Sequence, residues 1–208
     1  MNTGFVYLAS ASPRRAELLR QLGVEFRVLP AEIDESAQAG ESPEHYVART
    51  AAAKAACVRR RLLGGTAPAP VLGADTVVVC DARVLGKPAD HAAAMEMLAV
   101  LSGRTHEVLS AVTVVDDTGT QTRVCSSKVR FRATTQAERA AYCATAEPYD
   151  KAGAYAIQGL AAAFVDHLDG SYSAVMGLPL CETAQLLARF AIPAWLHAPQ
   201  NAARGEIR

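Results

Sequence analysis

Two hairpins interrupt an otherwise regular alternation of strands and helices, and they limit the possible fold more than any other feature of the chain. The first begins in the β-branched run at residues 71–80, which turns at residues 81–83 into a short return strand. The second joins a strand at 108–115 to a strand at 122–131 through Asp116-Asp117-Thr118-Gly119, a typical hairpin sequence. Because a hairpin pairs its strands antiparallel, an all-parallel doubly wound sheet is excluded. We predict an α/β fold in which helices flank a mixed β-sheet.

The other predicted elements rest on apolar patterning and on helix-capping signals. Apolar runs predict further strands at 5–9, 26–29 and 161–168. Capping residues and their followers predict helices at 12–22, 43–63, 90–101, 135–144 and 179–190. A Gly/Pro-rich loop covers 64–70. We find no repeat or linker that divides the chain, so we predict a single domain over residues 1–195 and a frayed tail at 196–208.

The charge balance excludes several classes of protein. The 208 residues contain 21 Lys and Arg against 21 Asp and Glu, which gives zero formal charge. A basic surplus supplies most non-specific affinity for nucleic acids, so we expect no nucleic-acid partner, and any bound anion must be held by a local cluster. No apolar run approaches the ~18 residues of a membrane span, and no leader segment is expected. The 5 scattered cysteines lack a C-x-x-C pair, which argues against disulfide and zinc scaffolds and for a reducing cytoplasm.

Arg14 and Arg15 occupy the first turn of a predicted helix, where the helix dipole favours acidic residues instead. Free backbone N–H groups and two guanidinium groups at such a turn favour an anion. The alternative is that both arginines point to solvent or pair with Glu17 and Glu25. No glycine-rich Walker loop is present, so bound phosphates would not be held in the P-loop manner.

Asp75 stands inside the apolar strand at 71–80. A buried carboxylate there costs several kcal/mol unless it is paired, hydrogen-bonded or bound to a metal. The basic residues that could pair with it are Lys54, Lys87 and Lys151. The alternative is a residue at the strand end that caps a neighbouring turn.

A short acidic segment, Glu32-Ile33-Asp34-Glu35, follows the second predicted strand and offers oxygen ligands for a hard cation such as Mg²⁺ or Mn²⁺. The alternative is a solvated loop. Among the histidines, His106 is the best placed, beside a basic Gly turn, and we expect it to be a fixed loop residue. The sequence contains no G-x-S-x-G nucleophile motif and no clear Cys–His arrangement.

Six motifs that contain these residues occur in a fixed order along the chain. They are Leu8-Ala9-Ser10-Ala11-Ser12-Pro13-Arg14-Arg15, Gly73-Ala74-Asp75-Thr76, Gly86-Lys87-Pro88, Ser102-Gly103-Arg104-Thr105-His106, Asp150-Lys151-Ala152-Gly153-Ala154-Tyr155-Ala156-Ile157-Gln158-Gly159 and Gly177-Leu178-Pro179-Leu180. Each motif alone is weak, but together and in this order they closely resemble the Maf family of nucleoside triphosphate pyrophosphatases. The resemblance spans residues 6–190.

The resemblance implies two lobes around a central cleft, with a shape related to the inosine-triphosphate pyrophosphatases. It also implies hydrolysis of a nucleoside triphosphate between the α- and β-phosphates, aided by a divalent metal cation (Mg²⁺, Mn²⁺ or Co²⁺). By analogy, Asp75 accepts the proton of the attacking water. The residues implied to bind the triphosphate are Ser10, Arg15, Lys54 and Lys87, and those implied to bind the metal are Glu35 and Asp75.

The family also divides by substrate. The branch that acts on dTTP and UTP carries Arg, Thr and Gln at three positions, as here at Arg14, Thr76 and Gln158, whereas the 7-methyl-GTP branch typically carries Trp, Gln and Glu. A neutral Gln158 side chain both donates and accepts hydrogen bonds, which suits the edge of uracil or thymine. The resemblance therefore predicts a cytoplasmic dTTP/UTP pyrophosphatase that removes unwanted or modified pyrimidine triphosphates, with a homodimer as an expected assembly. The alternatives are a 7-methyl-GTP or inosine-type pyrophosphatase, and a nucleotide-binding regulator of cell division and septum formation that acts through a protein partner.

Overall fold

The structure, a computed structural model, describes residues 4–62, 69–192 and 194–195. It confirms the predicted mixed sheet, whose seven strands run in the order β2-β1-β3-β5-β6-β7 with β4 paired to β3. The strands are β1 (Phe5–Leu8), β2 (Glu25–Val28), β3 (Val71–Cys80), β4 (Arg83–Leu85), β5 (Thr105–Val115), β6 (Thr120–Phe131) and β7 (Val165–Asp169). β1 pairs in parallel with β2 and β3, whereas both predicted hairpins and the β3–β5 and β6–β7 pairs are antiparallel.

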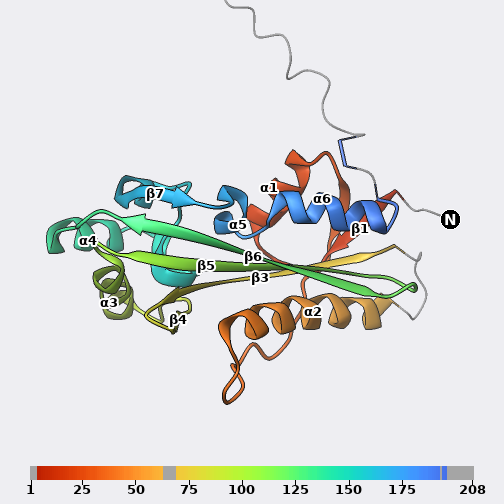
Figure 1. Cartoon of the computed structure of the whole chain (residues 1–208), viewed down its shortest axis with the longest axis horizontal. Coiled ribbons are helices and arrows are strands. Elements are labelled where there is room, and N and C mark those ends of the chain that lie inside the picture. Colours follow the sequence, from red (N-terminus) through yellow and green to blue (C-terminus); the bar gives the residue numbers. More distant parts are fainter. Residues whose placement is uncertain (1–3, 63–68, 193, 196–208) are drawn as a thin grey trace, which may run out of the picture.

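Helices cover both faces of the sheet (Figure 1). The α-helices are α1 (Pro13–Gln21), α2 (Pro43–Leu62), α3 (His91–Leu101), α4 (Gln136–Cys143), α5 (Tyr172–Met176) and α6 (Leu180–Arg189), and the 3₁₀ helices are η1 (Glu147–Asp150), η2 (Ala152–Ala154) and η3 (Leu160–Phe164). Figure 1 shows α2 on one side of the long strands and α1 and α6 on the other.

The alternation of side chains along β3 explains this layering. Leu72 and Ala74 belong to the apolar cluster that α1 and α6 cover, whereas Val77 and Val79 pack with Val47 and Ala51 of α2. Successive side chains of a strand point to opposite faces, so a continuously apolar strand is buried on both sides. β3 therefore lies at the centre of the fold, with its odd-numbered face toward α2. Its even-numbered face packs at Leu72 and Ala74 against α1 and α6, and at Val78 and Cys80 against the second lobe.

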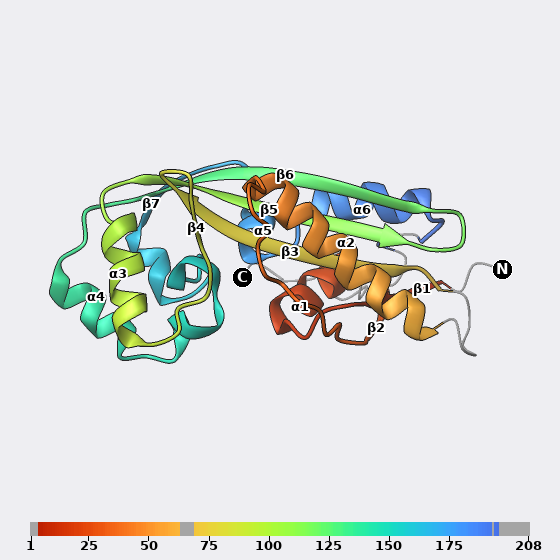
Figure 2. The same ribbon diagram turned by 90° about the horizontal axis from the view of Figure 1, so that it is seen from below.

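The molecule has two lobes (Figure 2). Figure 2 shows α1, α2, α6, β1 and β2 gathered at one end and α3, α4, β4 and β7 at the other, with the long strands β3, β5 and β6 running through both. The second lobe has its own apolar cluster, whose largest fully buried side chains include Phe131, Leu98 and Leu101. The predicted two-lobed arrangement is thus present.

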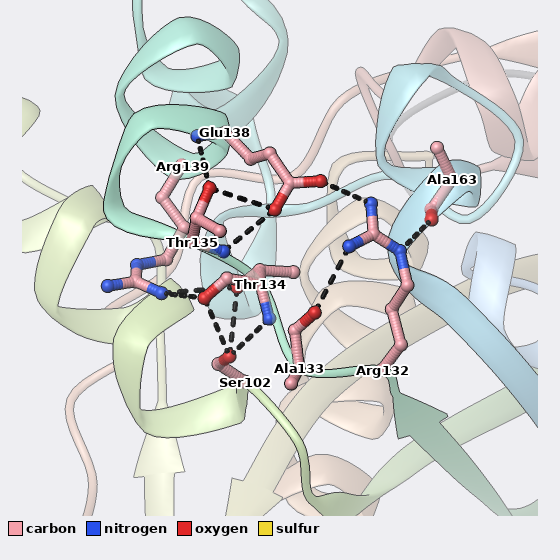
Figure 3. Close-up of polar contacts among 8 residues, drawn as sticks. All are labelled: Ser102, Arg132, Ala133, Thr134, Thr135, Glu138, Arg139 and Ala163. Carbon is pink, nitrogen blue, oxygen red and sulfur yellow. Dashed lines mark hydrogen bonds and ion pairs between the residues drawn. The ribbon is translucent and has the colours of Figure 1, made fainter.

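A polar cluster joins the end of α3 to the start of α4 in the second lobe (Figure 3). The predicted capping box is present, because the Thr135 hydroxyl accepts from the Glu138 N–H and Glu138 accepts from the Thr135 N–H. Glu138 also accepts from Arg132 at 2.7 Å, and the Thr134 N–H donates to the Ser102 hydroxyl at 2.8 Å. Ser102 belongs to one of the six motifs, so at least this part of the pattern serves the folding of the second lobe.

The predicted strand at 161–168 is wrong over its first half. Residues 160–164 form the 3₁₀ helix η3, and β7 begins only at Val165. The three consecutive alanines at 161–163 are poor strand formers, and the carboxylate of Glu147 accepts the N–H groups of Leu160 and Ala161 at 3.0 and 3.3 Å, which supports the start of the helix.

Two further differences from the prediction concern helix α5 and His106. Helix α5 was not predicted; its N-cap Ser171 accepts from the Ala174 N–H, and it ends at Gly177, with φ +122°. His106, expected in a loop, lies in β5 and is 3% exposed.

Part of the predicted loop at 64–70, the predicted helix end at residue 63 and the predicted tail at 196–208 lie outside the described residues. No helix in the described parts of the chain is long and apolar enough to cross a membrane.

Candidate active site

A cleft of about 520 Å³ is lined by residues of both lobes. One wall comes from the β1–α1 junction, the β2–α2 segment and α2, and the opposite wall from β4, the segment after it and the stretch from η1 to Gln158. All the residues implied by the family resemblance line this cleft: Ser10, Arg14, Arg15, Glu35, Lys54, Asp75, Thr76, Lys87 and Gln158. Residues far apart in the sequence therefore meet at one site.

Asp75 lies on the face of β3 that packs against α2, and of the three lysines considered as its partner it pairs with Lys54. The Lys54 Nζ donates to Asp75 Oδ1 at 2.7 Å. This pairing depends on Gly73, two residues earlier on the same face, where a Cβ atom would lie 2.3 Å from the Ala51 carbonyl oxygen. The absence of a side chain at Gly73 lets α2 approach the strand closely enough for Lys54 to reach the carboxylate.

Burial controls the protonation of Asp75, which is 5% exposed. Removal from water raises the pKa of the Asp75 carboxyl above its ordinary value, while the neighbouring Lys54 and Arg15 partly oppose this rise. A carboxylate with a raised pKa is a stronger proton acceptor than a solvated one. Asp75 is therefore suited to take a proton from water in the cleft.

Glu35 brings a second carboxylate to the same lysine, with Oε1 3.0 Å from the Lys54 Nζ. Its side chain is 50% exposed. Glu35 and Asp75 thus converge on one cationic group, and two carboxylates with phosphate oxygens and waters form a donor set that suits Mg²⁺ or Mn²⁺. Among the described residues, no group of three or more His, Cys, Asp or Glu side chains is arranged to hold a metal by itself. The residues fit a metal that is shared with a phosphate ligand.

Arg14 and Arg15 lie at the N-terminus of α1 as predicted, and within the part of the chain that the structure describes neither pairs with Glu17 or Glu25. The Arg15 Nε donates to the Gly177 carbonyl at 2.8 Å, and its terminal nitrogens lie 3.3 Å from the Ser10 hydroxyl and 3.4 Å from the Thr76 hydroxyl. The Ser10 hydroxyl also accepts from the Ser12 N–H at 3.2 Å. Ser12 occupies the N-cap position without a side-chain capping bond, so the first turn keeps donors that can face an anion.

Arg14 instead reaches across the cleft to the second lobe, where its Nη1 lies 2.9 Å from Asp150 Oδ2. Asp150 also pairs with Lys151 next to it. Arg14 is one of the positions that the family resemblance implies for substrate specificity, and this contact links α1 to η1.

The second lobe contributes Lys87 and Gln158, both exposed within the cleft. The Gly153 N–H donates to the Gly86 carbonyl at 3.0 Å, which ties η2 to the segment that carries Lys87. Gly153 has φ +70°, and a Cβ there would lie 2.9 Å from Val78 Cγ2. A glycine is therefore required where this wall of the cleft packs on β3.

Asp150 and Tyr46 also line the cleft, although neither is among the site residues predicted from the sequence. Tyr46 precedes Lys54 by eight positions, a spacing that places both on one side of a helix, but nothing in the sequence indicates what Tyr46 contacts. Conversely, the motif at 102–106 does not line the cleft. Its His106 Nε2 lies 2.9 Å from the Tyr155 hydroxyl in the second-lobe core, and burial lowers the pKa of His106 to about 4.

The chain is similar to several known proteins. The chain is 54% identical over 192 residues to a protein of Burkholderia pseudomallei named dTTP/UTP pyrophosphatase, with 88% of this chain and 92% of the relative covered. It is 54% identical over 195 residues to a protein of the same name from Ralstonia nicotianae, with 90% and 94% covered. A solved nucleoside-triphosphatase / dITP/XTP pyrophosphatase from Mycobacterium abscessus is similar with a TM-score of 0.38 and 21% identity, covering 61% of this chain and 73% of that one.

A family model described as Maf-like protein matches residues 5–190. The match includes both lobes and every residue of the cleft discussed above. This protein therefore belongs to the Maf family.

Proposed function

We propose that this protein hydrolyses dTTP and UTP, and modified pyrimidine triphosphates, to the nucleoside monophosphate and pyrophosphate. The observation that carries the proposal is that the residues implied by the six motifs, although scattered from Ser10 to Gln158, all line one cleft. The high identity to relatives named dTTP/UTP pyrophosphatase, over more than nine-tenths of their length, supports the substrate class.

Asp75 is assigned as the general base. Lys54 engages its Oδ1, and burial raises its pKa, so its other oxygen is suited to accept a proton from an attacking water. The water oxygen then bonds to the α-phosphorus, the bond from that phosphorus to the bridging oxygen breaks, and pyrophosphate leaves. No covalent enzyme intermediate is required.

The cationic side chains are assigned to the triphosphate. Arg15 is held in place by the Gly177 carbonyl, Lys54 lies beside the base, and Lys87 is exposed on the opposite wall. Positive groups fixed before the substrate binds stabilise negative charge that develops in the transition state. Ser10 adds a hydroxyl next to Arg15. The chemistry that a divalent cation supplies when held by Glu35 and Asp75 is neutralisation of phosphate charge and orientation of the α-phosphate.

Gln158 is assigned to the edge of the base, because its amide offers both a donor and an acceptor. Arg14 flanks the same pocket from α1, where Asp150 holds it. The Thr76 hydroxyl is already engaged by Arg15 and by the Ser110 hydroxyl at 2.9 Å. We therefore assign Thr76 to shaping the pocket through Arg15 rather than to a direct bond with the base.

The substrates assigned here are free nucleotides, and we propose that the protein acts on them in the cytoplasm, as a monomer or homodimer. The 5 cysteines of the chain are free thiols in the structure, which suits a reducing compartment. Analytical ultracentrifugation would decide the assembly.

The test is a panel of triphosphates that includes dTTP, UTP, 7-methyl-GTP and ITP, each assayed with Mg²⁺, Mn²⁺ and Co²⁺. We expect nucleoside monophosphate and pyrophosphate in equal amounts, with the highest kcat/KM for dTTP and UTP. Preference for 7-methyl-GTP or ITP would refute the substrate assignment. Release of orthophosphate, or tight binding of dTTP without turnover, would refute the reaction.

A further inference from the structure

The segment between β2 and α2, residues 29–42, contains no helix or strand although it carries Glu35. Glu35 is half exposed, and its carboxylate touches Lys54 alone among the ion pairs of the described residues. A side chain on an irregular, exposed segment loses its position unless the backbone beneath it is held. The question is therefore what fixes the backbone at Glu35.

Two side chains from the first turns of α2 hold the backbone at this point. The Tyr46 hydroxyl donates to the Glu35 carbonyl at 2.8 Å. Arg49 donates through Nη2 to the next carbonyl, that of Ser36, at 3.0 Å. Consecutive carbonyl groups are thus fixed by side chains one helical turn apart, which restrains the direction of the Glu35 side chain.

Arg49 is itself held rigidly. Its guanidinium group forms a two-pronged contact with Glu41, at 2.6 Å from Nε and 2.8 Å from Nη2, the strongest geometry for such a pair. The Glu41 side chain is 8% exposed. The hydrogen bond from Arg49 lowers the pKa of Glu41 to about 2. The guanidinium group also lies 5.5 Å from the centre of the Tyr46 ring, so the two holding residues contact each other.

The same helix carries Lys54, which contacts Glu35 at 3.0 Å and Asp75 at 2.7 Å. Residues spaced by three or four positions, or by twice that spacing, share a helix face; Tyr46 lies three positions before Arg49 and eight before Lys54. Helix α2 therefore fixes both the backbone at Glu35 and the position of its ionic partner Lys54. Through its close approach to β3 at Gly73, the same helix also sets the distance between Lys54 and the strand that carries Asp75.

We propose that Tyr46 and the Arg49–Glu41 pair are positioning residues that hold Glu35 in place to bind the divalent cation together with Asp75. This inference rests on the proposed function, because it takes the role of Glu35 from it. The positioning residues act through the backbone of residues 35–41, which they hold by hydrogen bonds to the Glu35 and Ser36 carbonyls.

The experiment measures Mn²⁺ binding directly, by electron paramagnetic resonance of the free ion, in the presence of the non-hydrolysable analogue α,β-methylene-dUTP. The variants are Tyr46→Phe, which removes one hydroxyl, and Glu41→Gln, which keeps the shape but removes the charge. We expect each to raise the Mn²⁺ dissociation constant roughly tenfold, the lower end of what outer contacts to metal ligands contribute. At saturating Mn²⁺, kcat for dTTP should return to within about twofold of wild type, because the catalytic groups are intact.

Matched controls come from the second lobe. Tyr149→Phe removes a hydroxyl that donates to the Cys143 carbonyl at 2.6 Å, and Asp166→Asn removes an ion pair with Arg130 at 2.7 Å. Both controls should bind Mn²⁺ as wild type does. Unchanged Mn²⁺ affinity in Tyr46→Phe and Glu41→Gln, or an equal loss in the controls, would overturn the proposal. A wild-type protein that binds Mn²⁺ but releases no pyrophosphate from dTTP would refute the proposed function instead, and the Mn²⁺ titration would still decide the positioning role.

Discussion

The close packing of α2 on β3 at Gly73 makes Gly73→Ala a severe test of how the site is built. A Cβ atom at this position would lie 2.3 Å from the Ala51 carbonyl oxygen, 2.8 Å from the Ala55 nitrogen and 3.0 Å from the Ala55 Cβ. The two nearest atoms belong to the helix backbone, so no side-chain rotation relieves the contact. Helix α2 must move away from β3 by about 1 Å to restore ordinary van der Waals separation.

This displacement of α2 has two expected consequences. Overpacking of this kind lowers the free energy of unfolding by about 2 kcal/mol. The 2.7 Å contact between Lys54 and Asp75 would lengthen beyond hydrogen-bond distance, and a displacement of about 1 Å at a catalytic group costs roughly 10²-fold in rate.

The assay combines urea unfolding with kcat/KM for dTTP. Gly86→Ala is the control for stability, because a Cβ at Gly86 would meet nothing within 4 Å, and it should unfold at the wild-type midpoint. If Gly73→Ala also unfolded at the wild-type midpoint and retained wild-type turnover, the close approach of α2 would not position Lys54, and the reasoning would be wrong.

Three other predictions test separate parts of the account. Arg15→Ala should lower kcat/KM for dTTP by about 10²-fold, through loss of a fixed cationic donor, and should cost about 1 kcal/mol of stability through its lost hydrogen bond to a main-chain carbonyl; wild-type kinetics would remove it from the phosphate site. Burial lowers the pKa of His106 to about 4, so below about pH 6.5 the unfolded chain binds a proton at this residue that the folded chain does not bind. The free energy of unfolding should therefore fall by about 2 kcal/mol from pH 7 to pH 5. His106→Phe should lose that part of the pH dependence in urea unfolding, and an unchanged slope would contradict the assignment. The combined variant Arg14→Trp, Thr76→Gln and Gln158→Glu should lower the ratio of kcat/KM for dTTP to that for 7-methyl-GTP, with the loss on dTTP exceeding the gain on 7-methyl-GTP; an unchanged ratio in a folded variant would show that these positions do not select the base.

The mixed sheet and the pairing of Asp75 were predictable because each follows from a short stretch of the sequence. Hairpin turns contradict a parallel sheet, and a carboxylate in an apolar strand demands a partner. Lys54 was one of three lysines that could meet that demand, and the sequence alone did not distinguish them. The choice depends on Gly73, whose closeness to α2 is a property of the packed structure.

Other features depend on contacts between distant residues and left no local signal. Arg14 pairs with Asp150, 136 positions away, whereas the sequence around it suggested a bound anion, solvent or the nearby glutamates. The 3₁₀ helix at Leu160–Phe164 replaced a predicted strand because Glu147 accepts its first N–H groups. In both places the polar partner lies outside the local sequence, so the local pattern does not reveal it.

The sequence pattern located Glu35 in an acidic segment but gave no reason to prefer it to its acidic neighbours. In the structure, the hydroxyl of Tyr46 fixes the backbone at this one residue, and Lys54 meets its carboxylate. The family resemblance had implied Glu35 as a metal ligand, and the structure supplies a physical basis for that proposal.

The central claim is that Asp75 is the general base for cleavage between the α- and β-phosphates. The most direct measurement is pyrophosphate release from dTTP by Asp75→Asn protein that is shown to be folded by circular dichroism. The amide keeps the shape of the carboxylate but cannot accept the proton of water, so the rate should fall by about 10²–10⁴-fold relative to wild type. A folded Asp75→Asn protein that releases pyrophosphate within a few-fold of the wild-type rate would contradict the account.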